Sequence, residues 1–346
     1  MIRSTPKTCY GALTVVLIGA GMAMAAPVHG QATEGFDPDY KVPRTPDGQP
    51  DLQGIWSNAV LTPLERPAEF ADRAFLTEAE AAAYQDRRND ETFRGNRDIP
   101  VETDVAHAYN DFWWDWGSEI ARTRRTSLII DPPDGRIPAL TPEGEERRAA
   151  REAYRSMHPA DGPEDRILRE RCIVWSGNGD QGAGPPMLPS AYNNNFHLVQ
   201  TPDHVLILKE MVHETRVVPL DGRPPMHESV RQWLGSSRGH WDGDTLVVTT
   251  TNFTHKTHFR STSEHMRLTE RFTRVDDDVL LYEFTVEDPV TLTRPWTAQI
   301  PTVRLDGLIY EFACHETNRG MVGILSGARA REQAAAETAN QEGADR

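Results

Sequence analysis

The chain has 346 residues, with 37 Lys plus Arg against 52 Asp plus Glu, and its formal net charge is -15 at pH 7. The mean hydropathy of -0.58 is typical of a soluble globular protein, and the length suffices for one large domain or two modest ones. The acidic excess argues against nucleic-acid binding, because neutralising phosphates requires surplus Lys and Arg. It also disfavours electrostatic binding to an anionic membrane surface. Composition therefore excludes several classes of protein but selects no function.

A cleaved secretory signal is predicted over residues 1–30. Arg3 and Lys7 precede an uncharged apolar run from Tyr10 to Ala26, which ends in small residues. The run is short for a membrane span, which needs about 20 residues, so no stable membrane insertion is expected. We expect a periplasmic or secreted protein. Loss of the two basic residues takes the net charge from -15 to -17.

Export changes the role expected of the cysteines. Cys9 leaves with the signal, and Cys172 and Cys314 remain as an even pair in an oxidising compartment. A disulfide between them would close a loop of roughly 140 residues and stabilise the fold by a few kcal/mol. The alternative is a free catalytic thiol beside His315, although adjacent residues on a strand point to opposite faces.

The first half of the mature chain predicts mixed structure. Residues 31–50 are polar and rich in Pro and Gly, which indicates an extended lead-in. A capping box, Thr77 to Glu80, opens a helix through Arg87, and Thr141-Pro142 opens another that runs to about Met157. Between these helices, residues 125–130 predict a strand, and a Pro-Pro-Asp-Gly turn leads to a second short strand.

From residue 196 onward the pattern changes to short strands separated by turns, one of them at 240–244. The expected strands are 196–200, 205–211, 215–220, 245–253, 268–275, 279–286, 296–303 and 308–314. Antiparallel meanders of this kind form barrels or curved sheets. We therefore predict a mainly β fold, a lipocalin-like barrel or curved sheet with helical and loop additions in the N-terminal half. One β-rich domain would cover 51–327, mixed over 51–170 and mainly β over 171–327, before a polar tail at 328–346.

Several stretches carry a family resemblance. They are PDLQGIW (50–56), LTPLERP (61–67), RTSLIIDPPDGRIP (125–138), PPMLPSAYNNN (185–195), RQWLGSSRGHWDGDTLVVTTTNF (231–253) and YEFTVEDP (282–289). On these motifs the chain resembles a family of exported, largely uncharacterised bacterial proteins, which implies export and a common fold but no catalytic residue. More loosely, the Gly54-x-Trp56 start followed by a meander is similar to lipocalin-type calycin barrels.

Polar residues around two predicted strands are candidates for a site. The amides of Asn193 and Asn194, beside Tyr192, can contact a polar substrate, or they can satisfy backbone groups in a tight turn. His213 is a candidate general base because its ordinary pKa suits proton transfer, although a lone His is often structural. Arg216 can position a substrate or form a surface ion pair with Glu214.

Two glutamates share one face of the predicted strand 279–286 and its end. If the opposite, apolar face packs outward, Glu283 and Glu287 line the interior and can divide into acid and base. If they face water, they are ordinary solvated residues. Arg231 is a further candidate for positioning substrate, and Trp233 and Trp241 are candidates for an aromatic pocket wall.

Several motifs that bind cofactors or metals are missing from the sequence. There is no phosphate-binding loop, H-E-x-x-H or C-x-x-C, and His255-x-x-His258 is the closest histidine pair. We expect no cofactor and assign no metal ligand, while a zinc site built from dispersed strands stays open.

Three functions remain. The first is an exported enzyme that performs cofactor-independent acid–base chemistry, of lyase, hydratase or isomerase type, on a small amphipathic or cyclic molecule. Its proton-transfer groups would be His213, Glu283 and Glu287. The second is a non-catalytic periplasmic protein that binds a small molecule. The third is an exported hydrolase with a dispersed metal site.

Overall fold

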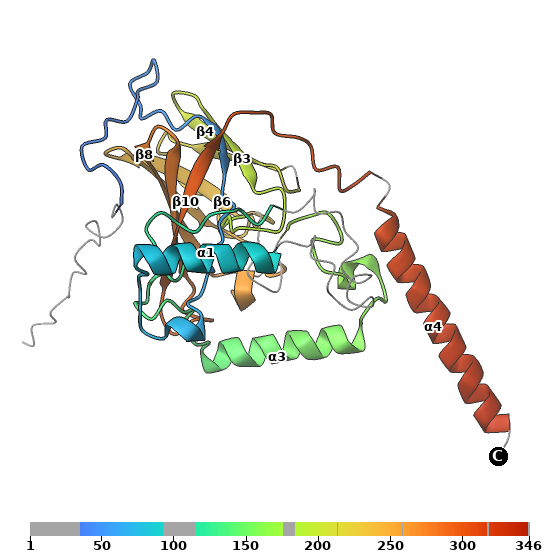
Figure 1. Cartoon of the computed structure of the whole chain (residues 1–346). Coiled ribbons are helices and arrows are strands. Elements are labelled where there is room, and N and C mark those ends of the chain that lie inside the picture. The colour runs from blue at the N-terminus through green and yellow to red at the C-terminus, as the bar shows by residue number, and fades with distance from the viewer. Residues whose placement is uncertain are drawn as a thin grey trace, which may run out of the picture.

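The computed structural model describes residues 35–92, 115–175, 184–212, 214–257, 259–316 and 318–344. Within these residues the strands form one ten-stranded antiparallel sheet in the order β5-β4-β3-β1-β10-β9-β8-β7-β6, with β2 added beside β10 (Figure 1). The strands are β1 (Gly54–Ser57), β2 (Ile129–Asp131), β3 (Asn195–Gln200), β4 (His204–Lys209), β5 (Thr215–Pro219), β6 (Ser236–Asp242), β7 (Thr245–Thr251), β8 (Arg267–Asp276), β9 (Val279–Glu287) and β10 (Trp296–Leu305). The mainly β prediction is confirmed.

The sheet is curved and open. Its edge strands β5 and β6 form no ladder with each other, yet a Cβ atom added to Gly239 of β6 would lie 2.7 Å from Leu220 and 2.8 Å from Val218. The two edges thus approach through side chains, and any residue larger than glycine here would require the Leu220 and Val218 side chains to shift. Of the two expected forms, the curved sheet is present and the closed barrel is not.

The concave face of the sheet carries the core, because alternate residues on a strand point to opposite faces. Trp56 on β1, Phe196 on β3, Phe284 on β9 and Trp296 on β10 are almost completely buried in one cluster. The same alternation sends polar residues to the outer face. This alternation therefore determines which charged residues point into the interior.

Helices lie outside the sheet. Helix α1 (Glu78–Thr92) begins with the predicted capping box, in which Thr77 N–H and Oγ1 donate to Glu80 and Glu80 N–H donates back to Thr77 Oγ1. Helix α3 (Pro142–Met157) begins at Thr141, whose side chain accepts from Gly144 N–H. Helix α4 (Arg319–Ala344) covers the described part of the predicted polar tail and projects away from the body (Figure 1).

Three local predictions are wrong. Residues 308–314 form no strand, and Leu308 and Tyr310 there are 76% and 71% exposed, because no neighbouring strand pairs with them. Residues 240–242 belong to β6 rather than to a turn, which is confined to the positions just before β7. The chain after the Pro132–Gly135 turn makes only an isolated bridge, Leu140 to Leu292, instead of a second strand.

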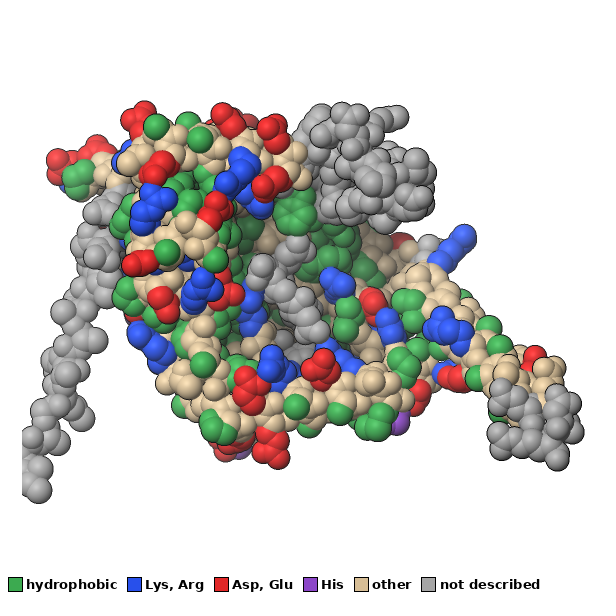
Figure 2. Space-filling view, turned by 60° about the horizontal axis from the view of Figure 1, so that its bottom comes forward, with side chains coloured by type: hydrophobic (Ala, Val, Ile, Leu, Met, Phe, Trp, Pro, Cys, Tyr) green, Lys and Arg blue, Asp and Glu red, His purple; other side chains and the backbone are tan. Residues whose placement is uncertain are grey.

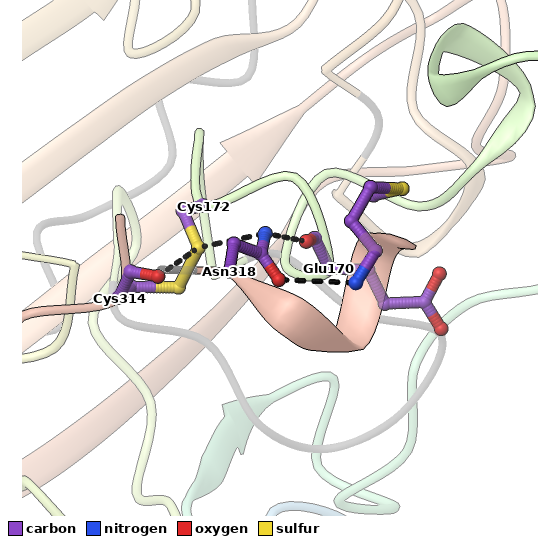
Figure 3. Close-up of a disulfide and its surroundings, with 5 residues drawn as sticks. Glu170, Cys172, Cys314 and Asn318 are labelled. Carbon is purple, nitrogen blue, oxygen red and sulfur yellow. Dashed lines mark hydrogen bonds between the residues drawn. A yellow bond between two sulfur atoms is a disulfide. The ribbon is translucent and has the colours of Figure 1, made fainter. Parts of the chain in front are cut away.

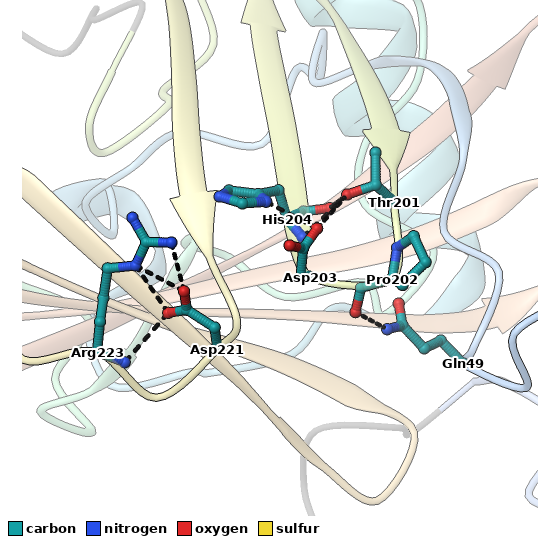
Figure 4. A network of polar contacts seen from close by, with 7 residues as sticks. All are labelled: Gln49, Thr201, Pro202, Asp203, His204, Asp221 and Arg223. Atoms are coloured by element: carbon teal, nitrogen blue, oxygen red, sulfur yellow. Dashed lines mark hydrogen bonds and ion pairs between the residues drawn. The ribbon is translucent and has the colours of Figure 1, made fainter.

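Polar contacts fasten the lead-in to one end of the sheet (Figure 4). Gln49 Nε2 donates to the carbonyl of Pro202 at 2.7 Å, in the turn between β3 and β4. In the same turn a hydrogen bond from His204 lowers the pKa of Asp203. Nearby, the Arg223 side chain lowers the pKa of Asp221 to about 2. These contacts lie on the surface and order the turns rather than the interior.

A disulfide joins Cys172 to Cys314 with a Cα–Cα distance of 5.6 Å (Figure 3). Beside it, Asn318 Nδ2 donates to the Glu170 carbonyl at 2.8 Å, and Asn318 Oδ1 accepts from Met321 N–H at 3.2 Å in the first turn of α4. The bridge therefore ties the segment after the sheet to the loop that precedes β3.

Loss of this bridge is expected to cost about 2–4 kcal/mol of unfolding free energy, because the unfolded chain regains the freedom of a long loop. The comparison is urea unfolding of the native protein and of the Cys172→Ser/Cys314→Ser variant, each with and without reductant. Reductant should lower the midpoint of the native protein and leave the variant unchanged. Equal midpoints for both proteins without reductant would show that the bridge does not constrain the unfolded chain.

Candidate functional site

A solvent-open pocket lies where β4 and β5 meet the segments 173–175 and 184–187. The volume within it that the centre of a water-sized sphere can reach is about 20 Å³. Most of its walls are apolar, and its charged members are Lys209, Glu214 and Arg216. The apolar lining residues are Ile173, Val174, Trp175, Pro185, Met187, Ile207, Met211, Val212 and Leu234. Apolar walls with a few convergent polar groups are typical of small-molecule sites.

Lys209 is the unusual member of this pocket. It is in phase with Val205 and Ile207 on β4, so its side chain enters the interior, and the residue is only 7% exposed. Its Nζ donates to the Asn194 carbonyl at 3.1 Å and to Asn58 Oδ1 at 3.4 Å. Burial lowers the pKa of Lys209 to about 7, and the nearby Glu210 carboxylate opposes this shift. Near neutral pH, a large fraction of the amine is therefore uncharged and able to accept a proton.

Arg216 enters the interior from β5 and is held from across the sheet. Its two terminal nitrogens contact Glu270 of β8 at 3.2 and 2.8 Å, and Glu270 is completely buried. The Tyr282 hydroxyl of β9 donates to the same carboxylate at 2.8 Å and accepts from Met187 N–H at 3.0 Å. Burial, and then the Glu270 charge, raise the pKa of Tyr282 well above its ordinary value, so the phenol stays protonated.

One buried donor of this network has no partner among the described residues. Arg216 Nε has no hydrogen-bond partner in the described part of the chain. Arg216 lines the pocket, and Glu270 fixes the plane of its guanidinium through a paired contact. The pocket therefore combines a weakly basic amine with a fixed cation, an arrangement that can remove a proton and stabilise a negative oxygen.

The two predicted catalytic glutamates lie elsewhere. Around the glutamates, the buried residues of β9 are Tyr282, Phe284 and Val286, so Glu283 and Glu287 point to the opposite, outer face. Gln299 Nε2 donates to Glu283 at 3.3 Å, and Glu287 pairs with Arg267 at 3.7 Å with both side chains largely exposed. Of the two alternatives for this strand, the structure has the one with the glutamates on the outer face, because the apolar face supplies the core. His213 lies outside the described residues.

The residues of the predicted polar loop, Tyr192 to Asn194, have different structural roles. Asn194 is completely buried, and its amide contacts Ser190 N–H, the Ser190 carbonyl and the Asp115 carbonyl. Its amide thus satisfies backbone groups, while its own carbonyl accepts from Lys209. Asn193 occupies the left-handed region at φ 55°. Tyr192 packs with Trp175 and Phe312 and touches the cluster of Met211 and Val212 beside the pocket.

The remaining predicted residues do not converge on the pocket. Arg231 is exposed and donates to the carbonyls of Phe253 and Glu264, which fixes its loop. Trp241 packs at the edge of the core, and Trp233 is half-buried in a turn next to Leu234, a wall residue. Arg216 is thus the one predicted substrate-binding residue among those lining the pocket.

Lys209 and Glu270 were absent from the sequence predictions, although a signal for both exists. In the alternating strands, Lys209 shares its phase with Val205 and Ile207, and Glu270 lies between the inward residues Leu268 and Phe272. A charged residue at an inward position of a strand is uncommon, and it points to an interior polar network.

Comparisons with known proteins identify no relative. No family model, no curated protein and no solved structure matches the chain. Within the described residues, no helix has the length and apolar character to cross a membrane. The same residues contain no group of three or more His, Cys, Asp or Glu side chains arranged to hold a metal ion. The pocket itself therefore carries the functional argument.

Proposed function

We propose that the protein is an exported enzyme that performs cofactor-independent acid–base chemistry in the Lys209 pocket. The observation that carries this proposal is a buried amine, with a pKa of about 7, in an apolar pocket that also holds Arg216. An ordinary lysine is almost fully protonated at neutral pH and is a poor base. Removal from water makes this one suitable for proton transfer.

The arrangement favours substrates that carry a carbonyl or carboxylate on an otherwise apolar skeleton. The neutral Lys209 amine removes a proton from the carbon next to the carbonyl, and the fixed positive charge of Arg216 stabilises the oxygen on which negative charge develops. The protonated lysine then returns the proton, either to a different carbon or to a leaving group. Isomerisation and elimination are thus the reaction types that this pocket supports best.

The apolar walls of the pocket support a second candidate function. Apolar side chains make up most of the pocket lining, as expected for a periplasmic protein that binds a small amphipathic molecule without changing it. In that function Lys209 and Arg216 would orient the polar end of the ligand. The two candidates differ in whether a proton moves.

The test is hydrogen exchange in D₂O, which needs no knowledge of the final product. Small ketones, cyclic enones and unsaturated carboxylic acids are incubated with the protein, and deuterium uptake next to the carbonyl is followed by NMR. Some member of the panel should exchange faster with the native protein, and Lys209→Met should lower that rate by about 10²–10⁴-fold. Lys256→Met, which alters an exposed lysine, is the matched control and should leave the rate unchanged.

Two outcomes oppose the catalytic proposal. Saturable binding of a panel member without any deuterium uptake would favour the binding protein. Uptake that survives in Lys209→Met at the native rate would assign proton transfer to another group.

A further inference from the structure

Helix α3 presents a row of arginines to the body of the protein. Its inner face is defined by Gly144, which is buried against the Thr291 backbone, and by Arg147, whose guanidinium donates to Thr291 Oγ1 at 3.1 Å. Arg151 and Arg155 follow at intervals of four residues and are half-buried on the same face. Neighbouring arginines in the row are four residues apart, which corresponds to a rise of about 6 Å along the helix axis.

The carboxylates of this helix lie on its exposed sides. Glu143, Glu145, Glu146 and Glu152 are all exposed, and Glu145 pairs with Arg148. Glu143 precedes Arg147 by four residues and Glu152 precedes Arg155 by three, whereas Arg151 has no glutamate three or four residues away on the helix. In the space-filling view, basic and acidic side chains are interspersed around the hollowed face of the molecule (Figure 2).

Arg151 stands out within the row. Arg147 contacts Thr291, and Arg155 also has an interaction within the chain. Arg151 forms no hydrogen bond or ion pair with another described residue, and burial, followed by the charges of Arg147 and Arg155, lowers its pKa to about 10. Like charges four residues apart weaken a helix, so the row costs stability unless an anion balances it.

We infer that Arg147, Arg151 and Arg155 form a binding site for a small polyanion, with Arg151 as its central contact. A guanidinium offers a planar pair of donors that matches carboxylate, phosphate and sulfate groups. The repeat of about 6 Å along the helix fits a ligand with two or more such groups. Partial burial keeps solvent from screening the attraction completely. This site is independent of the Lys209 pocket and of its proposed chemistry.

The experiment is calorimetric titration of the native protein with citrate and, separately, with inorganic pyrophosphate at low ionic strength. The two probes distinguish carboxylate from phosphate preference. At least one should bind, and Arg151→Gln should weaken that binding by about tenfold or more, because it removes a charge-assisted contact. Arg44→Gln, which alters an exposed, ion-paired arginine outside α3, is the matched control and should change the affinity by less than about twofold.

A stability measurement shows whether Arg151 is left for a ligand or is a structural cation that the chain itself neutralises. Without ligand, Arg151→Gln should unfold at the same urea concentration as the native protein or at a higher one, because it relieves repulsion within the row. A clearly lower midpoint would mean that the chain itself neutralises Arg151, and it would overturn the inference. So would equal weakening by Arg151→Gln and Arg44→Gln, or no binding of either probe at about 10 mM.

Discussion

The Lys209→Met variant should be more stable than the native protein at pH 7, by roughly 2 kcal/mol in equilibrium urea unfolding. Holding a lysine with a pKa of about 7 inside the fold costs about 4 kcal/mol relative to a solvated lysine at neutral pH. Methionine has similar length and no charge to desolvate. Loss of the hydrogen bonds to Asn194 and Asn58 offsets part of the gain.

The sign of the pH dependence follows from proton binding. Because the pKa is lowered in the folded state, the unfolded chain binds more protons between about pH 7 and pH 10.5. The cost of Lys209 is fully present below the folded pKa and disappears as the pH rises toward the unfolded value. The advantage of Lys209→Met should therefore be largest below pH 7, shrink as the pH rises, and reverse near pH 10.

Lys256→Met is the control for this stability series, because Lys256 is exposed and its substitution should change stability by less than about 0.5 kcal/mol. A difference between native protein and Lys209→Met that stays constant from pH 6 to pH 10 would contradict the lowered pKa. A methionine variant that is less stable throughout would show that the ammonium is well satisfied where it lies.

The Glu270→Ala variant should lose about 3–5 kcal/mol of unfolding free energy, because it leaves the Arg216 charge buried and unpaired. It also removes the acceptor of the Tyr282 hydroxyl. The double variant Arg216→Met/Glu270→Leu removes both charges and should recover most of this loss, since apolar residues often replace a buried pair without cost.

An exposed ion pair on the neighbouring strand is the comparison for the buried ion pair of Glu270. Glu287, on the next strand, pairs with Arg267 at 3.7 Å, and 42% of its side chain is exposed. Glu287→Ala should therefore cost less than about 1 kcal/mol. If Glu270→Ala and Glu287→Ala have similar small effects in the same urea series, the interior network does not hold a buried charge.

Apolar runs bounded by turn residues account for how much of the fold could be predicted. Strands β3 to β5 and β7 to β10 are rich in apolar and β-branched residues, and each is predicted near its observed position. Strand β6 is not predicted because its sequence, SSRGHWD, carries one large apolar residue and resembles a turn. Segment 308–314 is also largely apolar, but composition does not show whether a partner strand is available.

The site was harder to predict than the fold because it depends on contacts between distant segments. The position of Lys209 inside the sheet can be deduced from its phase on β4, but its desolvation depends on Asn58 and Asn194, which other segments bring to it. The Arg216 and Glu270 pair spans 54 residues and crosses from an edge strand to β8. Glu283 and Glu287 were proposed as catalytic because the sequence does not show which face of β9 is covered.

The titration of Lys209 itself tests the account most directly. The chain contains only four lysines, Lys7, Lys41, Lys209 and Lys256, so selective ¹³C or ¹⁵N labelling of lysine gives few signals, and Lys209→Met assigns the one of interest. The account predicts that this signal titrates with a midpoint near pH 7 in the folded protein. A midpoint near 10.5, the ordinary value, would contradict both the buried amine and the acid–base function built on it.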